Sequence, residues 1–277
     1  MLRGRLKSGG GGQERSMMRR SYPTDLTDKQ WELLEPLIPG PKPGGHPRTV
    51  NIREVVNALL YLNRTGCQWA FLPHDFPPAG TVYWYFQQWR DDATWEKIHD
   101  ALREQVRRAE GREPSPSAGI LDSQSVKTTE VGGPCGFDAA KNVKGRKRHV
   151  LVDTLGLVWG LLVTPADIQD YDGGWMVLES LAGRCVRLVK IWADGRYAGA
   201  LVEIAAEWYH RVLEIVPRAP EAKGFVVQAH RWLVERTLAW FGNCRRLSKD
   251  YEELLPSSEA LIRLCMIHLM LRRLQPA

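Results

Sequence analysis

The chain has 277 residues, of which 44% are hydrophobic and 25% charged, the composition of an ordinary globular protein. Its formal net charge is +6, but most of the excess lies in residues 1–20, which hold six arginine and lysine side chains and one glutamate. The net charge of the whole chain therefore does not indicate a nucleic-acid partner. Only local clusters of basic residues can support that inference. The five cysteines include no closely spaced pair, which argues against a zinc knuckle or a disulfide framework.

The first residues are basic and then glycine-rich, with no apolar stretch typical of a signal peptide. We interpret residues 1–20 as a flexible basic tail without assigned function, and Met17 or Met18 is an alternative first residue. No apolar run reaches the roughly 18 residues of a membrane-spanning helix. We therefore expect a reduced cytoplasmic protein with no membrane association.

Residues 21–113 have the apolar spacing of a bundle of short helices. Thr27 and Gln30 form a capping-box pattern at the start of the first helix. The expected helices span residues 28–38, 52–64, 81–90 and 94–110. Such a bundle is either a DNA reader of the helix-turn-helix type or a plain structural bundle, and the pattern alone leaves both readings open.

Beyond a polar boundary at residues 111–117, the pattern changes to alternating strands and helices. The expected strands span residues 117–121, 148–152, 157–163, 186–192 and 212–216, and the expected helices 171–182, 198–209, 230–241 and 257–274. This alternation predicts a mixed α/β fold, in which helices pack on a mixed sheet over residues 117–277.

Three acidic residues fall at special places in this second half. Asp122 follows the first expected strand, Asp194 follows the fourth, and Glu235 lies near the middle of the helix at 230–241. If the first and fourth strands are neighbours, the two aspartates meet at the carboxyl ends of the strands. Three carboxylates can hold two Mg²⁺ ions about 4 Å apart, which together assist an in-line phosphoryl transfer.

Each acid also has a plainer interpretation. Asp122 fits a strand-end cap, and Asp194 before Gly195 fits a turn residue. Glu235 fits a surface acid paired with Arg231, one helical turn earlier. Taken singly, none of the three indicates a catalytic site, but their joint placement on one sheet-and-helix domain favours one.

Several long blocks of the sequence, in the same order, carry a family resemblance. They include YPTDLTDKQWELLEPLIP, ILDSQSVKTTE, KNVKGRKRHVLVDTLGL, IWADGRYAGALV and RWLVERTLAWFGNCRRLSKDYE. From about Tyr22 to Leu274, the chain resembles the DDE transposases of bacterial insertion sequences, in particular the insertion-sequence-five group.

The resemblance implies a ribonuclease-H-like catalytic domain at residues 117–277 behind an all-helical, DNA-binding domain at residues 21–113. Asp122, Asp194 and Glu235 match the DDE triad, which implies two Mg²⁺ or Mn²⁺ ions per site. The implied activity is metal-dependent cleavage at the ends of a mobile element, followed by strand transfer into target DNA. The implied partners are double-stranded DNA with terminal inverted repeats and a second copy of the chain.

Basic residues near the triad are candidates for binding the DNA backbone. A run of charge is often a solvated face, but here Lys141–Arg148 leads into a strand beside the proposed site. Arg231 also matches the arginine of the family's tyrosine–arginine–glutamate signature, whereas Gln228 and Gly242 do not match its tyrosine and lysine. The predicted DNA contacts are Lys127, Lys144, Arg146, Lys147, Arg148, Arg231, Arg245 and Arg246.

Two rival functions stay open at this point. A metal-dependent nuclease of the same fold would cut DNA without joining strands. A domesticated DNA-binding protein would have lost catalysis, yet all three acids are present. A transcription factor would leave the whole α/β half of the chain unexplained.

Overall fold

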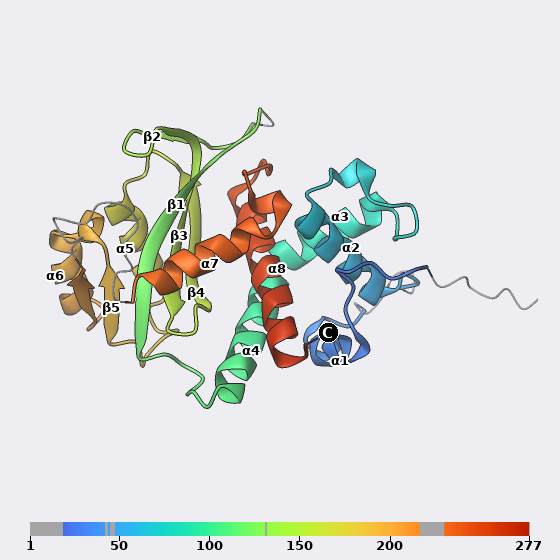
Figure 1. Ribbon diagram of the computed structural model, residues 1–277, viewed down its shortest axis with the longest axis horizontal. Helices are drawn as coiled ribbons and strands as arrows, with labels where there is room; N and C mark the ends of the chain where they lie inside the picture. The colour runs from blue at the N-terminus through green and yellow to red at the C-terminus, as the bar shows by residue number, and fades with distance from the viewer. Residues whose placement is uncertain (1–18, 42–43, 45–47, 131, 217–229, 277) are drawn as a thin grey trace, which may run out of the picture.

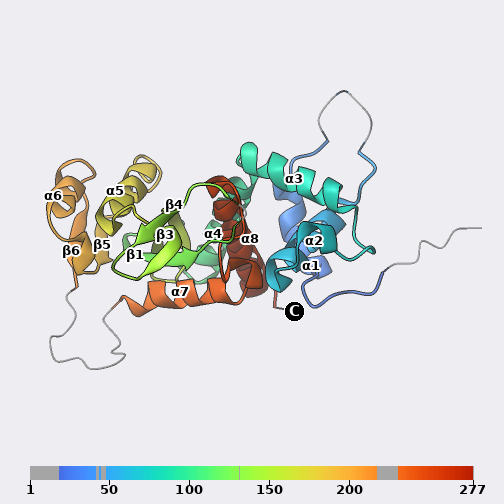
Figure 2. The same ribbon diagram turned by 90° about the horizontal axis from the view of Figure 1, so that it is seen from above.

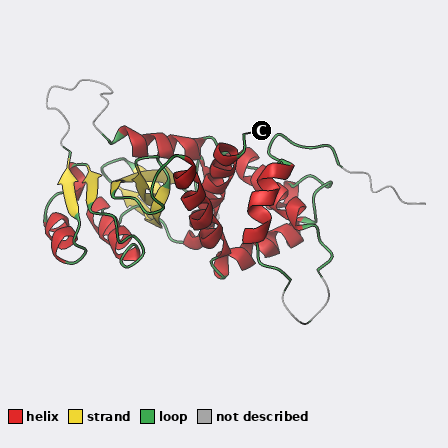
Figure 3. Ribbon diagram, turned by 90° about the horizontal axis from the view of Figure 1, so that it is seen from below, coloured by secondary structure: helices red, strands yellow, loops and turns green. Residues whose placement is uncertain are grey.

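The computed structural model describes residues 19–41, 44, 48–130, 132–216 and 230–276. The sheet lies at one end of the molecule and the first helices lie at the other, with two long helices between them (Figures 1 and 3). Most of the expected tail, including Met17 and Met18, lies outside the described residues. Arg19 does not belong to a free tail, because its guanidinium binds Asp25 at 2.7 Å and Glu54 at 2.5 Å.

The first half of the chain is helical, as predicted. Its capping box is confirmed, because Thr27 Oγ1 accepts from the Gln30 N–H and Gln30 Oε1 accepts from the Thr27 N–H. The helix expected to reach residue 38 stops at Leu34 and continues as a 3₁₀ turn that contains Pro36, a residue that cannot donate to the helical ladder. The elements are α1 (Asp28–Leu34), η1 (Glu35–Leu37), α2 (Ile52–Thr65), η2 (Trp69–Phe71), α3 (Ala79–Asp91) and α4 (Thr94–Ala109).

The second half of the chain builds a six-stranded mixed sheet. Its strands are β1 (Ala118–Lys127), β2 (Gly136–Asp138), β3 (Val143–Asp153), β4 (Val158–Pro165), β5 (Lys190–Ala193) and β6 (Val212–Ile215). Strand β1 is antiparallel to β3 and parallel to β5, and the order β4-β3-β1-β5-β6 is that of a ribonuclease-H-like fold. The condition under which Asp122 and Asp194 converge is met, because β1 and β5, the strand before Asp194, are neighbours.

Two boundaries differ from the prediction in ways that matter for the site. Strand β1 continues to Lys127, so Asp122 lies in mid-strand and not after its end. The continuation pairs with the first half of β3, which begins at Val143, five residues before the expected start. The three-residue strand β2 was not predicted; it pairs with the start of β3, along the edge that β4 occupies farther on.

Helices cover both faces of the sheet (Figure 2). One face packs on α5 and α6, and the other on α7 together with α4 and α8. The alternation of β1 divides its side chains between the faces, so Ile120 joins the core on the α7 side and Leu121 joins the core on the α5 side. The helices and turns are α5 (Asp170–Ser180), η3 (Gly195–Tyr197), α6 (Ala200–Glu207), α7 (Trp232–Gly242), η4 (Arg245–Leu247) and α8 (Leu255–Leu274).

The core on the α7 side is continuous with the core of the helical half. Buried side chains of α4 and α8 pack together and reach the sheet, and Arg107 of α4 forms a buried ion pair with Asp153 of β3. The polar boundary at residues 111–117 does separate α4 from β1. Because one hydrophobic cluster crosses it, a division into two independently folding domains stays a prediction. No helix in the described part of the chain is both long and apolar enough to cross a bilayer.

Candidate active site

Three carboxylates from three elements surround one arginine on the α7 side of the sheet. Arg231, the residue before α7, holds one guanidinium nitrogen 3.7 Å from Asp122, 3.5 Å from Asp194 and 4.0 Å from Glu235. Since each oxygen lies within 4.0 Å of the same atom, no two of them can be farther apart than twice that distance. Residues separated by more than a hundred positions therefore share one site.

Local hydrogen bonds hold the two aspartates. The Asp194 carboxylate caps the 3₁₀ turn η3 by accepting from the Arg196 N–H at 2.9 Å. The Asp122 carboxylate accepts from the Ser123 N–H at 2.7 Å. The turn role that the sequence allowed for Asp194 is thus present, and it leaves the second carboxylate oxygen of Asp194 facing Arg231.

The start of α7 is fixed against β5 by an aromatic stack. The His230 ring lies 4.1 Å from the Trp192 ring at an interplanar angle of 15°. His230 also has a left-handed backbone with φ of 66°, which is uncommon for a residue other than glycine. This turn directs Arg231 and Glu235 toward Asp194, and Glu235 lies in the first turn of α7, not near its middle as predicted.

The three carboxylates lie at increasing exposure. The side chain of Asp122 is 14% exposed, that of Asp194 is 21% exposed and that of Glu235 is 38% exposed. The pKa of Asp122 is raised to about 6, chiefly by burial and also by the negative charge of Asp194, which together outweigh the lowering effects of the Ser123 N–H, Arg231 and Lys141. The cluster thus has more negative charge than one arginine can neutralise, which is the electrostatic condition for binding cations.

The chemistry of these side chains fits divalent metal ions. Hard cations such as Mg²⁺ take carboxylate oxygens, usually with substrate phosphate completing the coordination. Within the described ranges, no three acidic, histidine or cysteine side chains already stand as the ligands of one ion. The cation that the three carboxylates share in this structure is the Arg231 guanidinium.

A second charged cluster lies under the site on the α5 face, and the sequence analysis did not identify it. Asp170, at the start of α5, accepts from Ser123 Oγ at 2.7 Å, from Lys147 Nζ at 3.1 Å and from the Arg196 guanidinium at 3.2 Å. Ser123 is the next residue after Asp122, and the Arg196 N–H donates to the Asp194 carboxylate. Asp170 therefore links both aspartate segments from below, although in the sequence it resembles any acid in a first helical turn.

Three residues of the predicted DNA-contacting run are in the interior. Arg146 is fully buried and binds Asp250 at 3.0 Å, and Lys147 binds Asp170. Arg148 is 1% exposed and donates to Gln124 at 3.1 Å. The prediction that these three side chains contact DNA is wrong for this structure, because protein groups already bind them where a phosphate cannot reach.

The prediction that Arg246 contacts DNA is wrong for the same reason. Its guanidinium is 7% exposed and binds the buried Glu252 carboxylate at 2.7 Å. Its neighbour Arg245 is exposed, so this part of the prediction is untouched.

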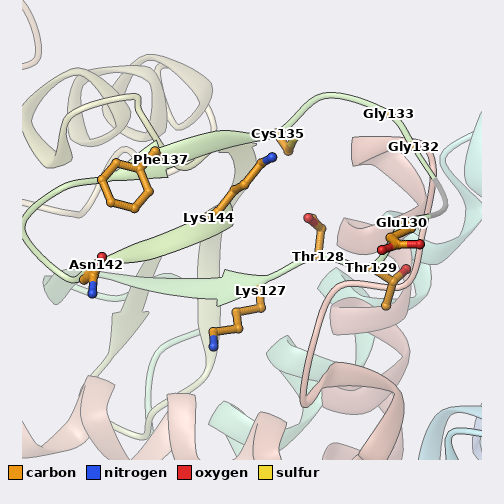
Figure 4. Close-up of a pocket in the computed structure, with 10 residues that line it drawn as sticks. All are labelled: Lys127, Thr128, Thr129, Glu130, Gly132, Gly133, Cys135, Phe137, Asn142 and Lys144. Carbon is orange, nitrogen blue, oxygen red and sulfur yellow. The ribbon is translucent and has the colours of Figure 1, made fainter.

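The exposed candidates lie on the far ends of β1 and β3. Lys127 and Lys144 line an open groove of about 620 Å³, together with the half-exposed ring of Phe137 on β2 (Figure 4). Lys127 is five residues beyond Asp122 on the same strand, which corresponds to roughly 17 Å along a strand. Lys127, Lys144 and Arg245 are thus predicted DNA contacts whose side chains are exposed.

Comparison with known families agrees with this geometry. Residues 113–270 match the family model described as "Transposase DDE domain", and residues 26–99 match a second model, described as "Putative transposase of IS4/5 family". Because the first match covers more than half of the chain, the protein belongs to the DDE transposase family.

A curated relative comes from the same kind of element. The chain is 28% identical over 117 residues to the insertion element IS402 uncharacterized 16.2 kDa protein of Burkholderia cepacia. The match covers 40% of this chain and 78% of the relative. No solved structure matches this chain.

Proposed function

We propose that this protein cleaves DNA at the ends of an insertion element and joins the freed 3′ ends to target DNA. The observation that carries the proposal is the convergence of Asp122, Asp194 and Glu235 around one cationic centre. Membership of the DDE transposase family supports transposition as the overall activity. The individual steps, and the assignment of these three residues to them, are the proposal.

In this proposal the three carboxylates hold two divalent ions, Mg²⁺ or Mn²⁺. Bound ions of this kind activate the attacking oxygen and stabilise the leaving oxygen of a phosphodiester. Asp122 and Asp194 sit on the sheet and provide the rigid part of the site, whereas Glu235 enters from α7 and is the most exposed. Their role is to position charge, because phosphoryl transfer depends chiefly on positioning and electrostatic stabilisation.

Arg231 has two tasks in this proposal. In the protein alone it neutralises the three acids, which lowers the electrostatic cost of holding them together. With ions held by the three carboxylates, this neutralising charge would no longer be needed, and Arg231 would be placed to bind a DNA phosphate beside the site. An arginine suits this exchange because its fork binds carboxylate and phosphate equally well.

The DNA backbone is proposed to pass the exposed basic residues Lys127, Lys144 and Arg245. They give affinity without sequence reading, as lysine and arginine contacts to phosphates do. Recognition of the element ends is assigned to the helical half, and a second copy of the chain is proposed to hold the second end.

A strand-transfer assay separates this function from a simple nuclease. The protein is incubated with a labelled duplex that ends in the element's terminal repeat, with a supercoiled target plasmid and with Mg²⁺ or Mn²⁺. Labelled plasmid is the expected product, and it should vanish in excess chelator. Cleaved duplex without labelled plasmid would favour the nuclease, and bound but uncut duplex would favour a DNA-binding protein without catalysis.

A further inference from the structure

Two free cysteines lie side by side behind the catalytic helix. Cys244 follows the end of α7, Cys265 lies on α8, and their sulfur atoms are 3.4 Å apart. Both side chains are buried, with residue exposures of 6% and 5%. The two cysteines are 21 positions apart in the sequence and belong to two segments of the α7-side core. Their proximity is therefore a result of the fold and not of local sequence.

The surroundings of the pair favour a reactive thiol. Both cysteines line a cavity of about 390 Å³ whose other residues include Arg64, Arg272 and Arg273 and no carboxylate. The hydrogen bond with Cys265 and the positive charge of Arg64 lower the pKa of Cys244, although burial acts in the opposite direction. Thiolates in positively charged, reachable surroundings are those that oxidants attack.

We infer that Cys244 and Cys265 form a site of reversible oxidation, at which hydrogen peroxide creates a disulfide between α7 and α8. The Cys244 thiolate attacks one peroxide oxygen, the O–O bond breaks, and after protonation a sulfenic acid and one water remain. The Cys265 thiol then attacks this sulfur, forms the S–S bond and releases a second water. In total, two thiols are oxidised by two electrons and one peroxide is reduced to two waters.

The bond would restrain the helix that carries Arg231 and Glu235. The bond would tie the segment that follows α7 covalently to α8, through two sulfurs that are now 3.4 Å apart. The amides of α7 should then exchange with solvent more slowly in the oxidised protein than in the reduced protein. This inference does not depend on the proposed transposition chemistry, since it concerns only the thiols and the two helices.

The bond can be detected directly in the full chain. Reduced protein is treated with hydrogen peroxide, blocked, and digested with trypsin without reductant. The expected product joins the peptides 237–245 and 264–272, lighter by two hydrogens than their sum, and disappears on reduction. Recovery of both peptides as separate, unlinked thiols after Cys135, an exposed cysteine, is fully oxidised would overturn the inference.

Single substitutions test the order of the two steps. Cys265→Ser should trap the sulfenic acid on Cys244, where dimedone labels it, while Cys244→Ser should leave Cys265 unlabelled. Cys185→Ser is the matched control for the loss of a buried thiol. Cys185 is also buried, but the hydrogen-bond partner of its thiol is the Ser115 hydroxyl. Cys244 should lose its thiol about tenfold faster than Cys185 in the native chain, and equal rates would contradict the assignment.

Discussion

Strand β1 separates two clusters of charged side chains. Their compositions are similar, but they differ in how closely the acids are paired with cations and hydrogen-bond donors. On the α5 side, Asp138 and Asp170 share Lys147. Asp138 also accepts from Ser125 Oγ and the Lys141 N–H, and Asp170 also accepts from Ser123 Oγ and the Arg196 guanidinium. On the α7 side, three acids share Arg231, and every one of its contacts with them is 3.5 Å or longer. Among the described residues, the acids of the first cluster have close cationic partners, whereas those of the second have only the longer contacts with Arg231 and, for Asp122 and Asp194, one backbone N–H each.

The comparison teaches how to distinguish structural charge from functional charge. A buried acid with a close cation and full hydrogen bonding has no capacity left for a ligand. Acids that crowd around one distant cation keep that capacity and are held together against their mutual repulsion. The following predictions test the two clusters, from the largest expected effect to the smallest.

Removing one charge from the open cluster should abolish catalysis. Asp122→Asn, Asp194→Asn or Glu235→Gln should each lower DNA cleavage by at least about a thousandfold, because each removes a metal ligand. DNA affinity should survive. Glu203→Gln is the matched control, since Glu203 is also a glutamate in a first helical turn but lies on α6. Normal cleavage by any triad variant would remove that residue from the proposed site.

Removing the cation from the closed cluster should instead destabilise the fold. Lys147→Met leaves the buried acids Asp138 and Asp170 without their shared partner. Loss of one member of a buried ion pair costs roughly 3–5 kcal/mol, which urea unfolding would measure. Lys144→Met, three positions earlier on the exposed end of β3, should change the free energy of unfolding by less than about 0.5 kcal/mol. Equal costs for the two variants would contradict the contrast.

The α5 side should also lose stability in mild acid. Burial lowers the pKa of His149 to about 4 from the ordinary 6.5, and its ring faces Gly173 and Thr164 on the α5 side. The unfolded chain therefore binds a proton below pH 6.5 that the folded chain refuses until about pH 4. Stability should fall as pH drops through this window, by up to roughly 3 kcal/mol from this residue.

His149→Gln isolates that contribution. Burial also lowers the pKa of His99 and His268 to about 4, so the variant should retain part of the acid sensitivity. The measurement is the free energy of urea unfolding at pH 7 and at pH 4.5, compared between variant and parent. An unchanged pH dependence in the variant would exclude His149 as a contributor.

Taking away Arg231 should make the open cluster a better metal site. Arg231→Gln removes the guanidinium that lies between the three acids, so Mn²⁺ should bind the DNA-free protein about tenfold more tightly, equivalent to roughly 1.4 kcal/mol. Titration calorimetry or the electron paramagnetic resonance of free Mn²⁺ reports this affinity. Weaker Mn²⁺ binding in the variant would show that Arg231 does not compete with the ions.

The smallest effect is expected at the exposed lysines. Lys127→Ala and Lys144→Ala should each weaken DNA binding several-fold and reduce the slope of log affinity against log salt by about 1, as the loss of one phosphate contact does. Arg187→Ala is the control, because Arg187 is an exposed cation before β5, at the opposite end of that strand from Asp194. The same change in slope for all three variants would mean that the lysines have no special place on the DNA path.

Local signals in the sequence predicted most of the fold. The capping box of Thr27, the helix that holds Glu235 and the strands β4, β5 and β6 all follow from short-range patterns. The sequence placed Asp122 and Asp194 after two strands, and their convergence depended on these strands being neighbours, a condition that the pairing of β1 with β5 meets.

What the sequence could not reveal depends on partners far along the chain. The second half of β1 is polar, and it is a strand because its backbone pairs with the first half of β3, while Ser123 bonds Asp170 and Gln124 bonds Arg148. The sequence around Arg146 is typical of a charged surface. Its buried ion pair with Asp250 depends on a residue more than a hundred positions later. The central place of Arg231 likewise depends on two aspartates from other elements, which no pattern around α7 could indicate.

The packing of α4 against α8 has a consequence for protein engineering. Helix α8 comes after Asp122, Asp194 and Glu235 in the chain, yet it packs on α1–α4 as well as on β4, and Gln30 of α1 donates to the backbone of Gln275. Helical halves therefore cannot be exchanged between related proteins by cutting at residue 113. A working chimera must carry α8 together with the helices that it contacts, so inherited variation in either partner has to be matched by variation in the other.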